Sequence, residues 1–153
     1  MDCVISGRGS KVVLLVLTER YLRRTIIYKI KGKTQEEVVG VLDKVERKYK
    51  SRFKKIFKSM TMDKGCEFTN QKPIERYLYT KKPVVTAYYA HPYSSWKRGS
   101  NDNTNKIIRR FIPKGSNISK YKEKEIQRIE NWINNYPRKI LGYRTTLEVY
   151  EAA

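Results

Sequence analysis

Hydrophobic positions in the first thirty residues follow the pattern of strands. Val12–Leu17 is a continuous apolar run rich in branched side chains, which is typical of a buried strand. A short polar link separates this run from Thr25–Ile30, which reads as its hairpin partner. Asp2–Ser6 is a shorter apolar stretch that a Gly-rich turn joins to the same run. We therefore expect three strands here.

After residue 33 the spacing of the apolar positions becomes helical. Thr34 and Glu37 form a capping-box pattern at the start of this segment. The positions that recur at helical spacing are Val38, Val41, Leu42, Val45 and Tyr49. The pattern predicts an amphipathic helix with this stripe turned toward a core.

Two more strands are expected in the middle of the chain. A short one ends at Asp63 and is followed by a turn at Gly65. The other covers Val84–Tyr89 and stops before Pro92, which cannot donate to a ladder. Ile74–Tyr79 is a candidate short helix between them.

The last third of the chain is predicted to be helical. One amphipathic helix takes Asn101 as its N-cap and buries a stripe of Thr104, Ile107, Ile108 and Phe111. The next ends before Pro137 and turns inward Ile126, Ile129, Ile133 and Tyr136. A final helix begins with Thr145 and Glu148 as a capping pair. This order predicts a mixed α/β sheet, led by a hairpin, in one domain over residues 1–153.

Charge points to an anionic partner. Among 153 residues, 34 Lys and Arg stand against 15 Asp and Glu, which gives a formal net charge of +19. Nucleic acid is the first expectation, because spread-out cations neutralise phosphates, and an RNA-binding or ribosomal protein fits the same numbers. An anionic membrane surface fits less well, because no basic amphipathic helix stands alone.

Targeting segments and cysteine usage predict the cellular compartment. The chain has no run of about 18 apolar residues and no signal-peptide pattern at its start, so we expect a cytoplasmic protein without a membrane partner. In that compartment Cys3 and Cys66 are expected to be reduced thiols rather than a disulfide.

Three acidic residues lie at the ends of predicted elements. Asp2 lies in the first strand, Asp63 ends the fourth, and Asp102 opens the helix after the fifth. Carboxylates that converge beyond strand ends can hold two divalent cations, and Mg²⁺ favours such oxygen ligands. A plainer interpretation stays open. An Asp in the first turn of a helix favours its dipole, and an Asp near Gly is ordinary turn chemistry.

Three segments of the chain carry a family resemblance. They are MDCVISGRGSKVVLLVLTER at the start, MDKGCEF in the middle and AHPYSSWKRGSNDNTNKIIRRFIPKG after the fifth predicted strand. With these, the chain resembles the catalytic core of DDE transposases of the insertion sequence thirty family, which belong with retroviral integrases in the ribonuclease H-like superfamily. The resemblance implies a five-stranded mixed sheet, with strands 1–3 antiparallel and 4–5 parallel, flanked by helices and followed by extra C-terminal helices.

The resemblance also implies a chemistry. Asp2, Asp63 and Asp102 match the catalytic, metal-binding carboxylates, which would hold two Mg²⁺ ions, with Mn²⁺ as a substitute. The reaction would be cleavage and strand transfer of DNA, at transposon ends and target, by a homodimer or larger assembly. Glu67 and Phe68 match the end of the middle motif.

The chain departs from the family pattern at three places. Asp102 stands where the family has Glu, and Lys64 stands where it has Asn. The chain also begins almost on the first carboxylate, so we expect the N-terminal helix-turn-helix region of the family to be absent. These departures leave two rival readings: a degenerate remnant that only binds nucleic acid, and a metal-dependent nuclease that does not join strands.

Basic and aromatic residues near the acids are candidate DNA contacts. They are Lys64, Trp96, Lys97, Arg98, Asn103, Lys106, Arg109, Arg110 and Lys114. A solvated basic face is the alternative for the cations, and packing within the loop is the alternative for Trp96. His91, the one histidine, could orient Asp102 or serve as a structural hydrogen-bond partner.

Overall fold

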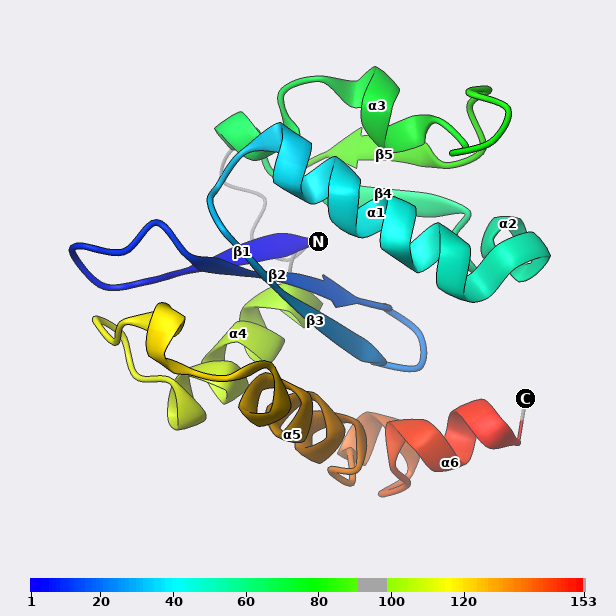
Figure 1. The fold of residues 1–153 in the computed structure, drawn as a ribbon. Helices are drawn as coiled ribbons and strands as arrows, with labels where there is room; N and C mark the ends of the chain where they lie inside the picture. Colours follow the sequence, from blue (N-terminus) through cyan, green and yellow to red (C-terminus); the bar gives the residue numbers. More distant parts are fainter. Residues whose placement is uncertain (91–98, 153) are drawn as a thin grey trace.

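The computed structural model describes residues 1–90 and 99–152, and two β-ladders lie at its centre (Figure 1). The first is antiparallel in the order β1-β2-β3, with bounds β1 (Asp2–Ile5), β2 (Val13–Thr18) and β3 (Thr25–Ile30). The second is parallel and pairs β4 (Ser59–Met62) with β5 (Thr86–Tyr89). The prediction of antiparallel strands 1–3 and parallel strands 4–5 is confirmed.

The two ladders meet at the start of the chain. The Met1 ammonium donates a hydrogen bond to the Thr61 carbonyl oxygen at 2.6 Å. This bond brings Met1, the residue before β1, beside β4, and Asp63 follows directly after that strand. The beginning of β1 and the end of β4 are therefore neighbours.

Helices cover both faces of the β1–β3 ladder (Figure 1). One face carries α1 (Gln35–Tyr49), with α2 (Phe53–Ile56) and α3 (Gln71–Glu75) beyond it. The other carries α4 (Gly99–Phe111) and α5 (Glu123–Asn134), and α6 (Thr146–Glu151) ends the described chain. Single 3₁₀ turns connect these elements: η1 (Lys50–Arg52), η2 (Cys66–Phe68), η4 (Ile118–Lys120) and η5 (Lys139–Leu141).

The continuous apolar run of β2 has a direct structural reason. Val13, Leu15 and Leu17 pack into the core shared with α1, while Leu14 and Val16 pack into the core shared with α4 and α5. Because successive strand side chains point to opposite faces, a strand covered on both faces must be apolar at every position. The helical stripe predicted from Val38 to Tyr49 is likewise buried.

Several boundaries differ from the sequence predictions. α4 begins at Gly99, so Asn101 is a buried residue inside the helix and not its N-cap. The strand β5 begins at Thr86 rather than Val84, because the Val84 amide donates to the Glu75 carbonyl oxygen at 2.8 Å instead of joining the ladder. The short helix predicted over residues 74–79 lies earlier in the chain, as α3 (Gln71–Glu75), and Arg76 instead forms an isolated bridge with Pro83.

Two predicted core aromatics lie at the surface. Phe111 is 38% exposed, and its neighbour Ile112 takes the buried position at the end of the α4 stripe. Tyr136 lies beyond the end of α5, is 44% exposed and stacks on Trp132. Both rings join one exposed aromatic row with Trp132, because Phe111 meets that indole edge-on at 5.0 Å.

Candidate functional site

Asp2 is held between its own strand and α4. The residue as a whole is only 9% exposed. Oδ1 accepts a hydrogen bond from the Cys3 backbone N–H at 2.9 Å, and Oδ2 accepts one from the Asn105 side-chain amide at 2.9 Å. The carboxylate is therefore oriented by a strand and by a helix more than a hundred residues away.

Asp63 lies in the turn after β4. Its Oδ1 accepts a hydrogen bond from the Gly65 backbone N–H at 3.0 Å, which closes the turn. Met1 is bonded to Thr61 of β4. Asp2 is the residue after Met1, and Asp63 comes two residues after Thr61. The structure thus places the start of β1, with Asp2, beside the last residues of β4, which Asp63 follows.

Asp102 is half-buried in the first turn of α4. It precedes Asn105, the partner of Asp2, by three residues, and residues three apart on a helix are neighbours on its surface. In the part of the chain that the structure describes, however, no three His, Cys, Asp or Glu residues lie close enough together to hold a metal ion. The acids share one region without forming a closed ligand cluster.

A fourth acidic residue, Glu67, lies in the 3₁₀ turn η2 that follows Asp63. Its side chain is 1% exposed, and its Oε1 lies 3.4 Å from the Lys33 ammonium. Burial alone would lower the pKa of Lys33. The negative charges of Glu67 and Asp63 outweigh this effect, so the pKa of Lys33 is raised. Glu67 was visible in the sequence as part of the middle motif, whereas Lys33 had no sequence signal.

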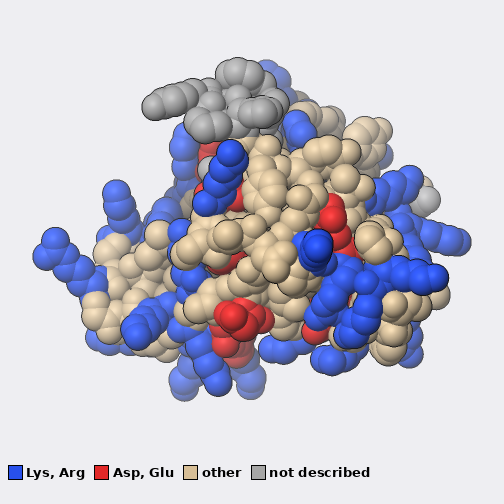
Figure 2. Space-filling view, turned by 90° about the horizontal axis from the view of Figure 1, so that it is seen from above, with Lys and Arg blue, Asp and Glu red and all other residues tan. Residues whose placement is uncertain are grey.

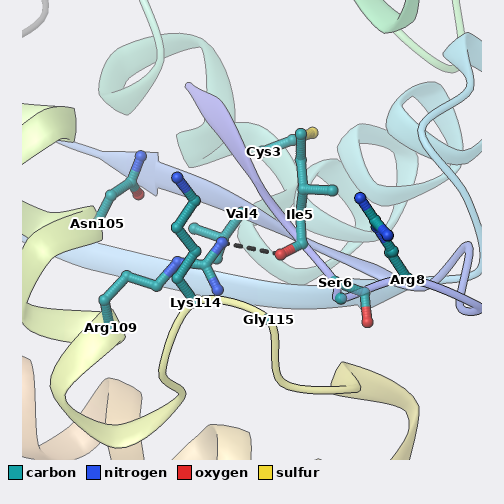
Figure 3. A pocket seen from close by; sticks show the side chains of 10 residues that line it. Cys3, Val4, Ile5, Ser6, Arg8, Asn105, Arg109, Lys114 and Gly115 are labelled. Carbon is teal, nitrogen blue, oxygen red and sulfur yellow. Dashed lines mark hydrogen bonds between the residues drawn. The ribbon is translucent and has the colours of Figure 1, made fainter.

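A basic hollow of about 460 Å³ adjoins Asn105 (Figure 3). It lies between the second half of β1 with its following turn and the end of α4 with its following loop. Figure 3 shows Arg109 and Lys114 on one side of it and Arg8 on the other. Arg109 donates from Nη2 to the Ile5 carbonyl oxygen at 2.8 Å, and burial lowers the pKa of Arg109. Arg8 was not among the predicted residues, because only the tertiary fold brings it near α4.

The remaining predicted DNA contacts are dispersed. Lys64, Asn103, Lys106 and Arg110 are exposed, and none of the four lines the hollow. Figure 2 shows Lys and Arg around the rim of the face seen from above, with few acidic residues between them. Trp96, Lys97, Arg98 and His91 lie outside the described residues. Among the described helices, none is long and apolar enough to cross a bilayer.

Comparison with known proteins gives a consistent result. No protein-family model matches the chain. It is 37% identical over 151 residues to the transposase for insertion sequence element IS4351 of Bacteroides fragilis, covering 99% of this chain and 43% of the relative. It is 34% identical over 151 residues to transposase InsI for insertion sequence element IS30A of Escherichia coli (strain K12), covering 98% of this chain and 37% of that relative. The chain thus spans about two fifths of the length of these relatives.

The fold has a counterpart among solved structures. A chain in the structure of the simian T-cell lymphotropic virus intasome in complex with PP2A regulatory subunit B56 gamma superposes with a TM-score of 0.73 at 12% identity, covering 99% of this chain and 54% of that one. At this identity the likeness concerns the fold, which is the ribonuclease H-like α/β fold expected from the sequence. Over nearly its whole length the chain is thus similar to transposases of insertion sequence elements, and it shares its fold with a chain of that intasome.

Proposed function

We propose that this chain is the catalytic domain of a transposase, which cleaves DNA and transfers the cut strand by metal-assisted phosphoryl transfer. The observation that carries the proposal is the hydrogen bond from Asn105 to Asp2. It ties the first acid to the helix that carries Asp102, within a chain related over its whole length to transposases. Asp63 follows the neighbouring strand β4, and the bond from Met1 to Thr61 supports placing it near Asp2.

Asp2, Asp63 and Asp102 are the proposed metal ligands. Their carboxylate oxygens are the donors that Mg²⁺ prefers, and Mn²⁺ can replace it. Two such ions would stabilise the attacking and leaving oxygens of the displaced phosphate. The Cys3 N–H and the Asn105 amide orient the two oxygens of Asp2, and the Gly65 N–H orients Oδ1 of Asp63, so the protein holds both proposed ligands in defined positions.

The basic hollow is the proposed contact for the DNA backbone beside the acids. Arg109 and Lys114 reach it from the end of α4 and its loop, and Arg8 reaches it from the turn after β1. Cations placed there would fix the register of a phosphate chain without reading its sequence. Lys64, Asn103, Lys106 and Arg110 would extend this contact over the exposed surface.

The proposed partners follow from the same chemistry. They are the DNA of the transposon ends and of the target, held by a homodimer or a larger assembly, because two ends must be joined in one event. The proposed location is the bacterial cytoplasm, on the nucleoid. A single catalytic domain over residues 1–153 also stays a prediction.

A strand-transfer assay tests the proposal. The purified chain is mixed with a labelled duplex carrying the element's ends, a target plasmid, and Mg²⁺ or Mn²⁺, beside Asp63→Asn as a matched control. Labelled strands joined to the plasmid, and absent with Asp63→Asn, are the expected result. Cut strands without joined products would instead identify a nuclease.

Two observations favour a second candidate function. The described acids do not form a group close enough to bind a metal, and Asp102 is shorter than the Glu of the family pattern. A degenerate core that only binds nucleic acid would have both features. It would bind DNA in a salt-sensitive way, with or without metal, and would give no cut product.

A further inference from the structure

Glu67 is a fully buried acid that the proposed chemistry does not use. Its side chain is 1% exposed, whereas Asp2 is 9% exposed. Burying a carboxylate is unfavourable unless the charge is paired and hydrogen-bonded. A residue of this kind therefore needs partners around it, and those partners show what it connects.

The partners of Glu67 come from three separate segments. Lys33, just before α1, supplies the opposite charge at 3.4 Å. Cys3, in β1, packs against the core cluster that contains Phe68, the residue after Glu67, and burial and the Glu67 carboxylate together raise the pKa of its thiol strongly. Cys66 Sγ, in the same turn as Glu67, lies 3.7 Å from Oε2. Cys3 is the neighbour of Asp2, so Glu67 contacts the strand that carries the first acid.

Gly65 connects Glu67 to the second acid. A Cβ on Gly65 would lie 2.5 Å from Glu67 Oε2 and 2.8 Å from its Cδ, so the backbone packs directly against the carboxylate. The N–H of the same residue donates to Asp63 at 3.0 Å. Gly65 has φ −64° and ψ 155°, a conformation open to any residue, so a side chain here would be opposed only by its contact with the Glu67 carboxylate, which would have to shift.

We propose that Glu67 is a positioning residue that fixes Asp2 and Asp63 relative to one another. It holds β1 through Cys3 and the turn after β4 through Gly65, while Lys33 balances its charge. Asn105 holds Asp2 from the opposite face of β1, because Asp2 and Cys3 point to opposite sides of the strand. This inference rests on the proposed function only in taking the two aspartates as metal ligands.

A purely stabilising ion pair is the alternative. It predicts that loss of the pair lowers the melting temperature without loosening β1 and the Asp63 turn in particular. Glu46 offers a matched control, because it is also buried, at 3% exposure, and accepts a hydrogen bond from the Leu78 N–H at 2.7 Å in another part of the fold.

The experiment compares Glu67→Gln with Glu46→Gln in the full chain. Amide hydrogen exchange without metal reports on residues 1–5 and 61–68, and calorimetric titration reports the affinity for Mn²⁺. We expect Glu67→Gln to speed exchange in both segments and to weaken Mn²⁺ binding by roughly 10- to 100-fold, the usual effect of losing an outer-shell partner. Glu46→Gln should change neither. Unchanged exchange in both segments of Glu67→Gln would overturn the proposal.

A second pair of variants keeps the test decisive if Glu67→Gln does not fold. Gly65→Ala would displace the carboxylate by contact alone, whereas Gly40→Ala adds a Cβ with nothing within 4 Å. Faster exchange of residues 1–5 in Gly65→Ala, but not in Gly40→Ala, supports the proposal, and no difference opposes it. If the native chain binds no Mn²⁺ while exchange responds as expected, the metal chemistry fails and the positioning role stands. If native binding is present and Glu67→Gln changes nothing, only the positioning role fails.

Discussion

The side-chain amide of Asn105 donates a hydrogen bond to Asp2 Oδ2 at 2.9 Å, across 103 positions of sequence. This contact joins the start of β1 to the second turn of α4, one turn beyond Asp102. An amide donor orients a carboxylate without adding a charge to the site. The relationship therefore links the packing of α4 to the geometry of the proposed catalytic acids.

Removing this donor should weaken metal binding. Asn105→Ala frees the Asp2 carboxylate to rotate, and we expect the affinity for Mn²⁺ to fall by roughly 10- to 100-fold. Calorimetric titration without DNA measures the change. Asn103→Ala is the matched control, because Asn103 is exposed on the same helix. Equal affinities for the two variants would contradict the role given to Asn105.

Lengthening Asp102 should raise activity. Asp102→Glu adds one methylene, about 1.5 Å of reach, and misplacing a catalytic group by about 1 Å can cost around a hundredfold in rate. We expect metal-dependent strand transfer to rise by up to about that factor. The double variant with Asp63→Asn should be inactive, which ties the gain to the metal site. Unchanged or lower activity in Asp102→Glu would show that its length does not limit the reaction.

The basic hollow should be visible in the salt dependence of DNA binding. Each phosphate contact contributes a slope of about −0.9 to log K against log salt concentration. Arg8→Ala and Lys114→Ala should each lose one phosphate contact and so make the slope less steep by about 1. Lys124→Ala, which removes an exposed lysine on α5 away from the hollow, is the control. A slope that changes equally in all three variants would indicate a diffuse basic surface instead.

The two thiols should differ sharply in reactivity. Burial and the neighbouring Glu67 raise the pKa of Cys3, whereas Cys66 is exposed. Because the thiolate is the reactive form, iodoacetamide at about pH 8 should alkylate Cys66 well before Cys3. Peptide mass spectrometry over time measures both rates. Glu67→Gln should speed the reaction of Cys3, and a Cys3 rate that matches Cys66 in the native chain would contradict the raised pKa of Cys3.

Stability should depend on pH through Glu46. Burial raises the pKa of Glu46, against the opposing effect of the Leu78 hydrogen bond. As pH rises through the window between the ordinary glutamate value, about 4.3, and the raised folded value, the unfolded chain releases its proton first. The free energy of unfolding contributed by Glu46 is thus present below this window and lost above it. Urea unfolding across pH should show wild type losing its advantage over Glu46→Gln as pH rises, and a constant difference would refute the shift.

The elements of this protein follow largely from local sequence. The apolar run of β2, the stripe of α1 and the caps at Thr34 and Thr145 were readable because periodicity and capping depend on neighbouring residues. The family motif likewise pointed to Asp2, Asp63 and Asp102. Boundaries were less secure: Ile112 rather than Phe111 completes the α4 stripe, because adjacent positions on a helix both lie near the edge of the buried face.

Only the tertiary structure decided which side chains surround the acids. Three pairs join segments that are distant along the chain, and no local sequence pattern predicts such contacts. They are Asn105 with Asp2, Lys33 with Glu67, and Arg8 across the hollow from Arg109. They arise because β1 is covered on one face by α4 and meets β4 at its start. Sequence by itself thus determined the strands, helices and candidate acids, while long-range packing determined the hydrogen bonds and charges that orient them.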